Sequence, residues 1–390
     1  MFFYKYQAIS PLSLAMLRHG EVFFASPQEL NDTHEAKPKF VFRGDDDVWR
    51  RFIYMVLVDM CILLNLDPES DLSKKIISLR ESVFSKIKST KKSSFEYQQL
   101  INILSSSIQT SVPIDWDARD KKIIHEVYCH YVNNVFDTYL EEIIYIASFS
   151  LSATSLTMWG HYGDAEKGFC LVYESLDGSV EIESDCELFW GVHGDEDSIQ
   201  TIGQVNKTLV NLNKIKYAKT PTRINGFGRL SKRFFYSEYE SHYDYREEVY
   251  SKTTDMHERE IGLVKYTDWK YEKEIRLHLP VCRFIPSSLR SIRVSAKHIK
   301  GVIFGPKASK VNRDNVLASL VHLKKYQMSK SEIFIFEAKG IANQYKMQVM
   351  PLGTLRDFFS SEIPMVVLFS EANSKSKEEA VIISEIINQS

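Results

Sequence analysis

Two glutamates near residue 270 are the side chains best suited to chemistry. Glu272 and Glu274 stand two positions apart in the segment DWKYEKEIRL. On a strand, this spacing directs both carboxylates to one face, while Lys273 and Ile275 point to the other. A carboxylate in a cleft can stabilise developing positive charge or act as a general base. The alternative interpretation is an exposed strand face whose charges are balanced by Arg276.

A second group of polar and aromatic side chains lies in the segment SFSLSATSLTMWGHYGDAEKGFCLVYE. Its members are Ser148, Ser150, Trp159, His161, Tyr162, Lys167 and Gly168. A strand, a polar turn and a short helix with these residues predict a cleft wall where a ligand stacks and hydrogen-bonds. The alternative is that Trp159 and Tyr162 are core aromatics on that helix.

Familiar metal and nucleotide motifs are missing from the sequence. His125 and His130 are five residues apart, which rotates them by about 140° on a helix and does not match a zinc-protease helix. There is no GxxxxGK[ST] loop, and INGFGR lacks the third glycine of a dinucleotide fingerprint. The five cysteines contain no CxxC pair. We therefore expect no resident metal.

The elements that must position these side chains are mostly strands. FFYKY has strand composition, and Ser10 then precedes a helix that begins near Pro11 and ends at Gly20. Further strands are predicted at EVFFAS, IYIASFS, GFCLVYE, SVEIE, IKGVIFGP, SEIFIFEA and within the segment from Lys265 to Leu279. DNVLASLVHLKKY predicts another helix.

This order of elements predicts an α+β fold with a mixed or split β-sheet core and a large helical insertion. The insertion at 46–143 shows apolar residues at helical spacing. We assign the first strands and helix of the core to 1–45 and its remainder to 144–340, with a polar insertion near 191–250. Residues 341–390 form a C-terminal extension whose terminal helix docks on the body of the protein or on a partner.

Composition limits the classes of partner. The 390 residues include 49 Lys and Arg against 51 Asp and Glu, so the formal charge of −2 provides no global attraction to nucleic acid or anionic membranes. A local basic patch is compatible with this balance, so nucleic acid stays among the candidate partners. The start MFFYKYQAIS lacks a signal-peptide pattern, and no window has the roughly 18 apolar residues of a spanning helix. We expect a cytoplasmic protein without a membrane partner.

Several segments, taken in order, resemble the bacterial family called domain of unknown function 2971. They are FYKYQAI, EVFFASPQELNDTHE, IASFSLSATSLTMWGHYGDAEKGFCLVYE, KYTDWKYEKEIRL and IKGVIFGP, and the resemblance covers roughly residues 2 to 307. The chain departs from the family pattern at Thr33, where proline is usual, and at Ser148, where cysteine is common. Asn31, Asp32 and Glu35 are present, so we expect the turn of the family to be retained.

A weaker likeness connects the chain to ADP-ribosyltransferases. Their split sheet carries an aromatic or basic residue on an early strand, a serine on a middle strand and a catalytic glutamate on a late strand. The residues placed at these three positions are Tyr4, Lys5 and Tyr6, then Ser148 and Ser150, then Glu272 or Glu274. The likeness implies NAD as co-substrate, with a carboxylate on the ribose hydroxyls and an aromatic ring against nicotinamide.

The leading hypothesis is a NAD-consuming ADP-ribosyltransferase-like enzyme that acts on an unidentified macromolecular target, as a bacterial toxin or an anti-phage defence effector. It assigns catalytic roles to Glu274, Glu272, Tyr4 and Lys5, with Glu274 favoured as the catalytic carboxylate. It assigns substrate-binding roles to Tyr6, Asn31, Asp32, Ser148, Ser150, Trp159, His161, Tyr162, Lys167 and Arg276.

Two alternatives stay open. The first is a non-catalytic sensor that binds a nucleotide or peptide in the cleft of Trp159, His161 and Tyr162 and contacts a protein partner through the helical insertion or the C-terminal helix. The second is a metal-dependent nuclease, in which Asn31, Asp32, His34 and Glu35 join His161 or a late glutamate around a metal.

Overall fold

The computed structural model describes residues 1–32, 34–140, 143–193, 201–230, 260–281, 283–329, 331–356, 365–368 and 374–389. The chain divides into two units: Met1–Ala36, Ile143–Lys219 and Gly262–Ser390 form the first, which we call the sheet unit, and Lys37–Glu142 and Thr220–Ile261 form the second, which we call the helical unit. Thr33 and much of the predicted polar insertion, at 194–200 and 231–250, lie outside the described residues.

The sheet unit is built on a 12-stranded sheet of described residues, in the order β19-β18-β17-β16-β6-β1-β5-β14-β10-β7-β15-β2. Its strands are β1 (Phe2–Gln7), β2 (Glu21–Phe23), β5 (Ile146–Ser150), β6 (Phe169–Glu174), β7 (Ser179–Glu183), β10 (Lys207–Lys214), β14 (Glu274–His278), β15 (Ser291–Val294), β16 (Ile299–Phe304), β17 (Phe334–Gly340), β18 (Met347–Arg356) and β19 (Met365–Leu368). Two smaller pairs join β8 (Phe189–His193) to β9 (Thr201–Val205) and β11 (Lys216–Ala218) to β13 (Val264–Tyr266).

The large sheet is mixed and opens near its middle. β16 and β17 run parallel, whereas β1 runs antiparallel to both β6 and β5. β1 pairs with β6 along its whole length but with β5 only at Tyr4 and Ser150. The predicted α+β fold with a mixed or split sheet is therefore confirmed.

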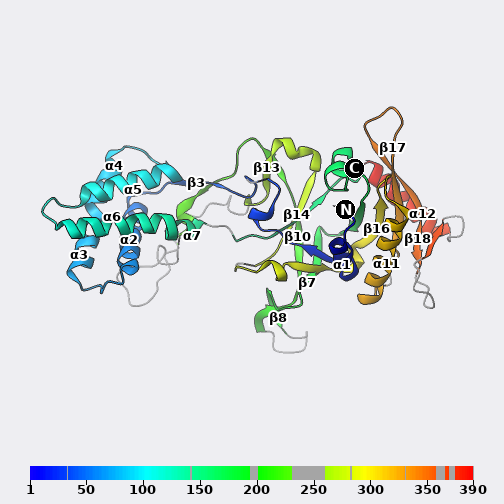
Figure 1. Cartoon of the computed structure of the whole chain (residues 1–390), viewed down its shortest axis with the longest axis horizontal. Helices are drawn as coiled ribbons and strands as arrows, with labels where there is room; N and C mark the ends of the chain where they lie inside the picture. Colours follow the sequence, from blue (N-terminus) through cyan, green and yellow to red (C-terminus); the bar gives the residue numbers. More distant parts are fainter. Residues whose placement is uncertain are drawn as a thin grey trace. The chain divides into compact units, whose positions relative to one another are not determined.

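Alternating side chains give the sheet two apolar faces, each covered by helices. Phe3, Phe149 and Ile275 pack on one face with α1 (Pro11–His19) and α11 (Lys310–Tyr326), which lie side by side in Figure 1. The opposite face packs against α8 (Leu156–His161) and α12 (Ser374–Gln389). This period of two is what a sheet buried on both sides requires.

Local sequence signals set the ends of α1 as predicted. Ser10 and Ser13 form a capping box, and Pro11 occupies the first turn. Gly20 ends the helix in the left-handed region at φ 72°, and a Cβ there would lie 2.9 Å from a side-chain carbon of Leu323. The helix therefore needs glycine at this position for both conformation and packing.

The C-terminal helix α12 packs on its own sheet unit. Asn388 donates its side-chain amide to the carbonyl of Val349 at 3.0 Å and accepts from the backbone N–H of the same residue at 2.8 Å. Its residues Ala380, Ile383 and Ile387 are buried against the sheet. Docking on the body, one of the two predicted outcomes, is thus observed; a partner for this helix stays a prediction.

The helical unit contains α2 (Asp46–Leu63), α3 (Asp71–Ser78), α4 (Arg80–Ser89), α5 (Tyr97–Ser111), α6 (Ala118–Tyr131), a π-helical turn (Val132–Phe136) and α7 (Asp137–Leu140). A three-stranded sheet of β12 (Arg223–Asn225), β3 (Lys39–Phe42) and β4 (Phe95–Glu96) joins them. Aromatic rings of Phe42, Trp49, Phe52 and Phe227 form the centre of its core. Among the described residues, no helix of either unit combines the length and apolar character needed to cross a membrane.

Candidate functional site

A pocket of about 350 Å³ lies in the sheet unit where β1 and β5 diverge. Its lining includes nine of the residues predicted to form a site: Tyr4, Lys5, Tyr6, Asn31, Ser148, Ser150, Tyr162, Glu272 and Glu274. The volume lies within the range of about 300–1,000 Å³ that small-molecule sites occupy. Residues from distant parts of the chain therefore meet in a cavity suited to a small ligand.

Three predicted residues stand in one row across neighbouring strands. Tyr4 of β1 pairs with Ser150 of β5, and Ser150 also pairs with Glu274 of β14. Directly opposed residues of antiparallel strands share a face of the sheet. Tyr4, Ser150 and Glu274 are thus adjacent on one face, at the point where the sheet opens.

The two glutamates do not share a strand. Glu272 ends a short 3-10 helix (Thr267–Glu272), and β14 begins only at Glu274. Lys273 between them has φ 45°, in the left-handed region, so the chain turns instead of alternating. The side chains nevertheless converge, with exposed fractions of 3% for Glu272 and 4% for Glu274, which rules out an exposed strand face.

Lys265 of β13 binds both glutamates. Its Nζ lies 2.6 Å from Oε2 of Glu272 and 3.0 Å from Oε2 of Glu274. A third carboxylate, that of Glu35, lies 3.4 Å away. Burial lowers the pKa of the Lys265 amine, but the charges of Glu274 and Glu272 outweigh burial and raise it above its usual value. Lys265 is therefore a buried ammonium shared by three carboxylates.

Arg276 holds Glu274 from the other side. Its Nε donates to Oε1 of Glu274 at 2.7 Å and its Nη2 to Oε2 at 2.9 Å. Nη2 also forms an ion pair with Oε1 of Glu35, and Nη1 donates to the carbonyl of Gly262 at 2.6 Å. This two-pronged geometry fixes the plane of the Glu274 carboxylate.

The five charged groups do not balance. The carboxylates of Glu35, Glu272 and Glu274 face the cations of Lys265 and Arg276, so one negative charge remains when all five are ionised. Burial raises the pKa of Glu274, and the nearby Lys265 only partly opposes this. Lys5 also lines the pocket, and its amine offsets this charge while it is protonated, so the pocket presents both carboxylates and an ammonium to a ligand.

Tyr162 joins the cluster from α8. Its hydroxyl donates to Oε1 of Glu272 at 2.6 Å and accepts from Nδ2 of Asn31 at 3.3 Å. Burial and the hydrogen bond to Glu272 both raise the pKa of this hydroxyl, which keeps it protonated. Tyr162 is therefore a neutral donor to the carboxylate at the pocket surface.

Ser150 and Tyr6 support the backbone beside the pocket. The Ser150 hydroxyl donates to the carbonyl of Glu272 at 2.6 Å, which ties β5 to the 3-10 helix. The Tyr6 hydroxyl donates to the carbonyl of Ser152 at 2.9 Å. Both side chains line the pocket, yet their hydroxyl hydrogens serve the loop after β5 and the turn before β14.

Lys5 provides the second lysine of the pocket. Its Nζ donates to the carbonyl of Ser148 at 2.8 Å and lies 5.3 Å from the ring centre of Phe149. Burial lowers its pKa to about 8, although the charge of Glu274 opposes the shift. Both lysines lie near an aromatic ring, Lys265 at 5.1 Å from the ring centre of Trp269, but Lys5 donates to a carbonyl where Lys265 binds carboxylates.

Five other predicted site residues do not line the pocket. They are Asp32, Trp159, His161, Lys167 and Arg276. Trp159 is fully buried, packs edge-on against Tyr6 and donates its indole N–H to the carbonyl of Ala153 at 2.9 Å. Asp32 accepts from the backbone N–H of His34 at 2.9 Å.

The remaining three of these residues differ in exposure. Arg276 is fully buried behind Glu274, whereas His161 and Lys167 are exposed. The Nδ1 atom of His161 lies 3.2 Å from the hydroxyl of Tyr271.

Lys265 is the central residue that the sequence did not identify. It lies seven positions before Glu272, a separation that neither a strand nor a helix pattern connects to a site. Tyr217 was missed as well: its hydroxyl accepts from the backbone N–H of Glu274 at 2.8 Å. A lysine inside the short apolar stretch GLVKY was the available signal, because buried lysines require anionic partners.

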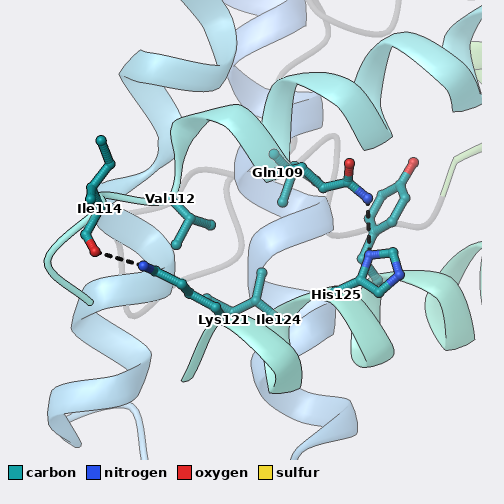
Figure 2. A pocket seen from close by; sticks show the side chains of 8 residues that line it. Gln109, Val112, Ile114, Lys121, Ile124 and His125 are labelled. Atoms are coloured by element: carbon teal, nitrogen blue, oxygen red, sulfur yellow. Dashed lines mark hydrogen bonds between the residues drawn. The ribbon is translucent and has the colours of Figure 1, made fainter. Parts of the chain in front are cut away.

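A second pocket, of about 530 Å³, belongs to the helical unit and is shown in Figure 2. Between α5 and α6, Ile108, Val112 and Ile124 provide apolar surface. Gln109 donates to Nδ1 of His125 at 3.0 Å, and Lys121 donates to the carbonyl of Ile114 at 2.6 Å. Within the described part of the chain, no carboxylate lines this pocket, whose ionisable groups are Lys121, His125 and Tyr128.

The carboxylates of the pocket face an ammonium group. Among the described residues, no three His, Cys, Asp or Glu side chains are grouped so that they could hold a metal ion. The three carboxylates that do converge, Glu35, Glu272 and Glu274, surround the ammonium of Lys265.

Comparisons with known proteins address the family alone. No curated protein and no solved structure matches the chain. The likeness to ADP-ribosyltransferases is therefore not shown and stays a prediction. The family model described as protein of unknown function (DUF2971) matches residues 158–277, which confirms the predicted family resemblance over the segment that includes Tyr162, Lys265 and both glutamates.

Proposed function

We propose that this chain is a NAD-consuming ADP-ribosyltransferase-like enzyme that modifies a macromolecular target. The observation that carries the proposal is the row formed by Tyr4, Ser150 and Glu274 on three neighbouring strands at the pocket. An aromatic residue on an early strand, a serine on a middle strand and a glutamate on a late strand are the pattern of that enzyme class. Their adjacency in the sheet is what a shared substrate site would need.

The charge of the pocket supports this chemistry. Cleavage of NAD breaks the bond between ribose C1′ and the nicotinamide nitrogen, and the electron pair leaves with nicotinamide. The ribose carbon becomes positively charged in the transition state, and a carboxylate held beside that carbon stabilises the charge. Glu274, fixed by Arg276, provides a carboxylate whose orientation is already set when substrate arrives.

The second half of the reaction is transfer. A nucleophile of the target forms a new bond to C1′ and gives up its proton, which a carboxylate of the pocket accepts. Glu272 lies beside Glu274 through the shared Lys265 and is available for this role. The rings of Tyr4 and Tyr162 line the pocket and provide faces for nicotinamide.

The cellular role follows from the activity proposed. An enzyme that depletes NAD or inactivates an essential macromolecule harms the cell in which it acts. We therefore propose a bacterial toxin or anti-phage defence effector that works in the cytoplasm. Growth of a bacterial host that expresses the wild-type chain or a Glu274→Gln chain tests this role, because only the wild type should slow growth.

One observation favours a binding module as the second candidate function. All four carboxylate oxygens of Glu272 and Glu274 already have partners in Tyr162, Lys265 and Arg276. Carboxylates whose oxygens are all hydrogen-bonded are held rigidly, and they suit a surface that recognises a nucleotide or peptide. The nuclease hypothesis has no such support, since no described group of ligands is arranged for a metal.

Nicotinamide release from NAD by the purified protein, with and without cell lysate, tests the proposal. The wild type should release nicotinamide, Glu274→Gln should lose at least about 100-fold in rate, and Glu126→Gln, on the exposed side of α6, should match the wild type. Full activity of Glu274→Gln would remove Glu274 from catalysis. Absence of release, together with an unfolding temperature that NAD does not change, would favour the binding module.

A further inference from the structure

The turn before the helical unit contacts the pocket at both of its ends. We call residues 29–32 and 34–35 the pocket turn. Glu29, Leu30, Asn31 and Glu35 line the pocket. Asp32 shapes the turn, because its carboxylate accepts from the N–H of His34 and its carbonyl from the N–H of Glu35 at 3.0 Å.

At the far end of the turn, Glu35 is buried with four other charged side chains. Together they form what we call the ion cluster: Glu35, Lys265, Glu272, Glu274 and Arg276. Its side chain is 2% exposed and reaches two cations. Oε1 forms an ion pair with Nη2 of Arg276, and Oε2 lies 3.4 Å from Nζ of Lys265. These are the same two cations that hold Glu274, so Glu35 acts on Glu274 through both of them.

At the near end, Asn31 reaches the other glutamate. Its side-chain amide donates to the Tyr162 hydroxyl, and Tyr162 in turn donates to Oε1 of Glu272. One short turn thus connects to Glu272 through Tyr162 and to Glu274 through Arg276 and Lys265. The sequence pattern Asn-Asp-x-x-Glu provides the residues that this double connection needs.

The stability of the fold alone does not explain why a glutamate is buried at position 35. Burying a third carboxylate beside two others adds repulsion and desolvation, and apolar side chains in place of buried ion pairs are often neutral or stabilising. A carboxylate buried at this cost is better explained by the orientation it imposes on its neighbours. The neighbours in question are the two carboxylates of the pocket.

We propose that Glu35 is a positioning residue of the pocket: through Arg276 and Lys265 it fixes the carboxylate of Glu274, and it makes the pocket turn part of the site. A catalytic consequence of Glu35 depends on the proposed function. The orientation of the Glu274 carboxylate by Glu35 does not depend on it. Glu35 lines the pocket but is assigned no contact with the reacting atoms.

The proposal predicts a change in pH dependence. The groups that face the cluster are Lys265 on β13, Glu274, Arg276 and His278 on β14, Glu272 on the 3-10 helix, Tyr162 on α8, Tyr217 on β11 and Lys5 on β1. Replacement of Glu35 by glutamine removes one negative charge near Glu274 while both cations stay. The pKa of Glu274, raised by burial, should then fall.

The test compares Glu35→Gln and Glu35→Asp with wild type in nicotinamide release. Glu35→Gln should lose at least about tenfold in kcat, change KM for NAD by less than about threefold and shift the acidic limb of the pH profile to lower pH. Glu35→Asp keeps the charge, so its pH profile should stay at the wild-type position while kcat lies in between. A folding defect alone would reduce activity without moving the profile.

Glu337→Gln is the matched control, because Glu337 also carries one arginine and one lysine partner, Arg313 at 2.6 Å and Lys339 at 3.0 Å, away from the pocket. It should leave kcat and the pH profile unchanged. If wild type is active and Glu35→Gln matches it in both respects, the positioning role is overturned while the proposed function stands.

A second readout needs no enzymatic activity. The ¹³C resonance of the Glu274 carboxyl, assigned by its loss in Glu274→Gln, reports its titration in the free protein. It should titrate at lower pH in Glu35→Gln than in wild type and be unchanged in Glu337→Gln. An identical titration in Glu35→Gln would overturn the proposal, even if no nicotinamide release is found.

Discussion

The ammonium of Lys265 lies 2.6 Å from the carboxylate of Glu272, and both side chains are almost fully buried. The pair therefore differs from the surface ion pairs of this protein, which water screens and which contribute little to stability. Inside a protein, removal of one partner leaves the other as an uncompensated buried charge. The stability of the sheet unit should depend strongly on this lysine.

Replacement of Lys265 by methionine should destabilise the protein by about 3–5 kcal/mol at neutral pH. Methionine has a similar length but no charge, so Glu35, Glu272 and Glu274 would face Arg276 alone. Urea unfolding of both proteins measures the difference. It should shrink at lower pH, because protonation of the carboxyls removes the repulsion.

The control for this prediction is Lys297→Met. Lys297 pairs with Glu181 at 3.0 Å, but its side chain is 55% exposed. Its replacement should change stability by less than about 1 kcal/mol and show no such pH dependence. Similar losses for both variants would mean that the carboxylate cluster relaxes without its lysine.

Local signals predicted a large part of the fold. Ser10, Pro11 and Gly20 set the ends of α1, and the runs of apolar residues predicted β1, β5, β16 and β17. These features depend on neighbours within a few residues, which is why the sequence alone reveals them. Tyr4, Ser150 and Glu274 were placed together only by the likeness to ADP-ribosyltransferases, which stays a prediction, and their pairing across three strands is seen in the structure.

The ion cluster could not be predicted from the sequence in this way. Glu35 and Lys265 are 230 positions apart, and only the folded sheet brings them to 3.4 Å. The alternating letters of EKEIR predicted one strand through both glutamates, but the left-handed Lys273 interrupts it. Tertiary contacts of Glu272 with Lys265 and Tyr162 override the local pattern there.

Trp159 provides a test of which aromatics form the pocket. It was expected to contact ligand, yet its ring is buried against Tyr6 and its N–H binds the carbonyl of Ala153. Trp159→Phe should therefore destabilise the protein by about 1–3 kcal/mol and leave affinity for NAD within about twofold. Urea unfolding and calorimetric titration measure the two effects. A large loss of affinity at unchanged stability would place Trp159 in the ligand site.

The pH dependence of stability should reveal His278. Burial, with the charge of Arg276, lowers its pKa from the ordinary 6.5 to about 4. As pH falls below about 6.5, the imidazole of His278 becomes protonated in the unfolded chain but stays neutral in the folded chain. The free energy of unfolding therefore has its full contribution from His278 above that pH and declines toward pH 4. His278→Gln should lose this component of the slope. Urea unfolding between pH 7 and pH 4.5 measures it, and equal slopes in both proteins would contradict the shift.

Lys5 links ligand affinity to pH near neutrality. Its pKa of about 8 means that the amine loses its charge between pH 7 and pH 9, whereas an ordinary lysine would keep it. If the diphosphate of NAD binds toward Lys5, affinity for ADP-ribose should fall over this interval, by at most about tenfold for each pH unit. Calorimetric titration at pH 7, 8 and 9 measures the change.

Lys5→Met should bind more weakly at pH 7 and show an affinity that does not vary with pH. Lys167→Met, altered at an exposed lysine outside the pocket lining, should follow the wild type. A wild-type affinity that is constant from pH 7 to pH 9 would show that the bound anion lies elsewhere in the pocket.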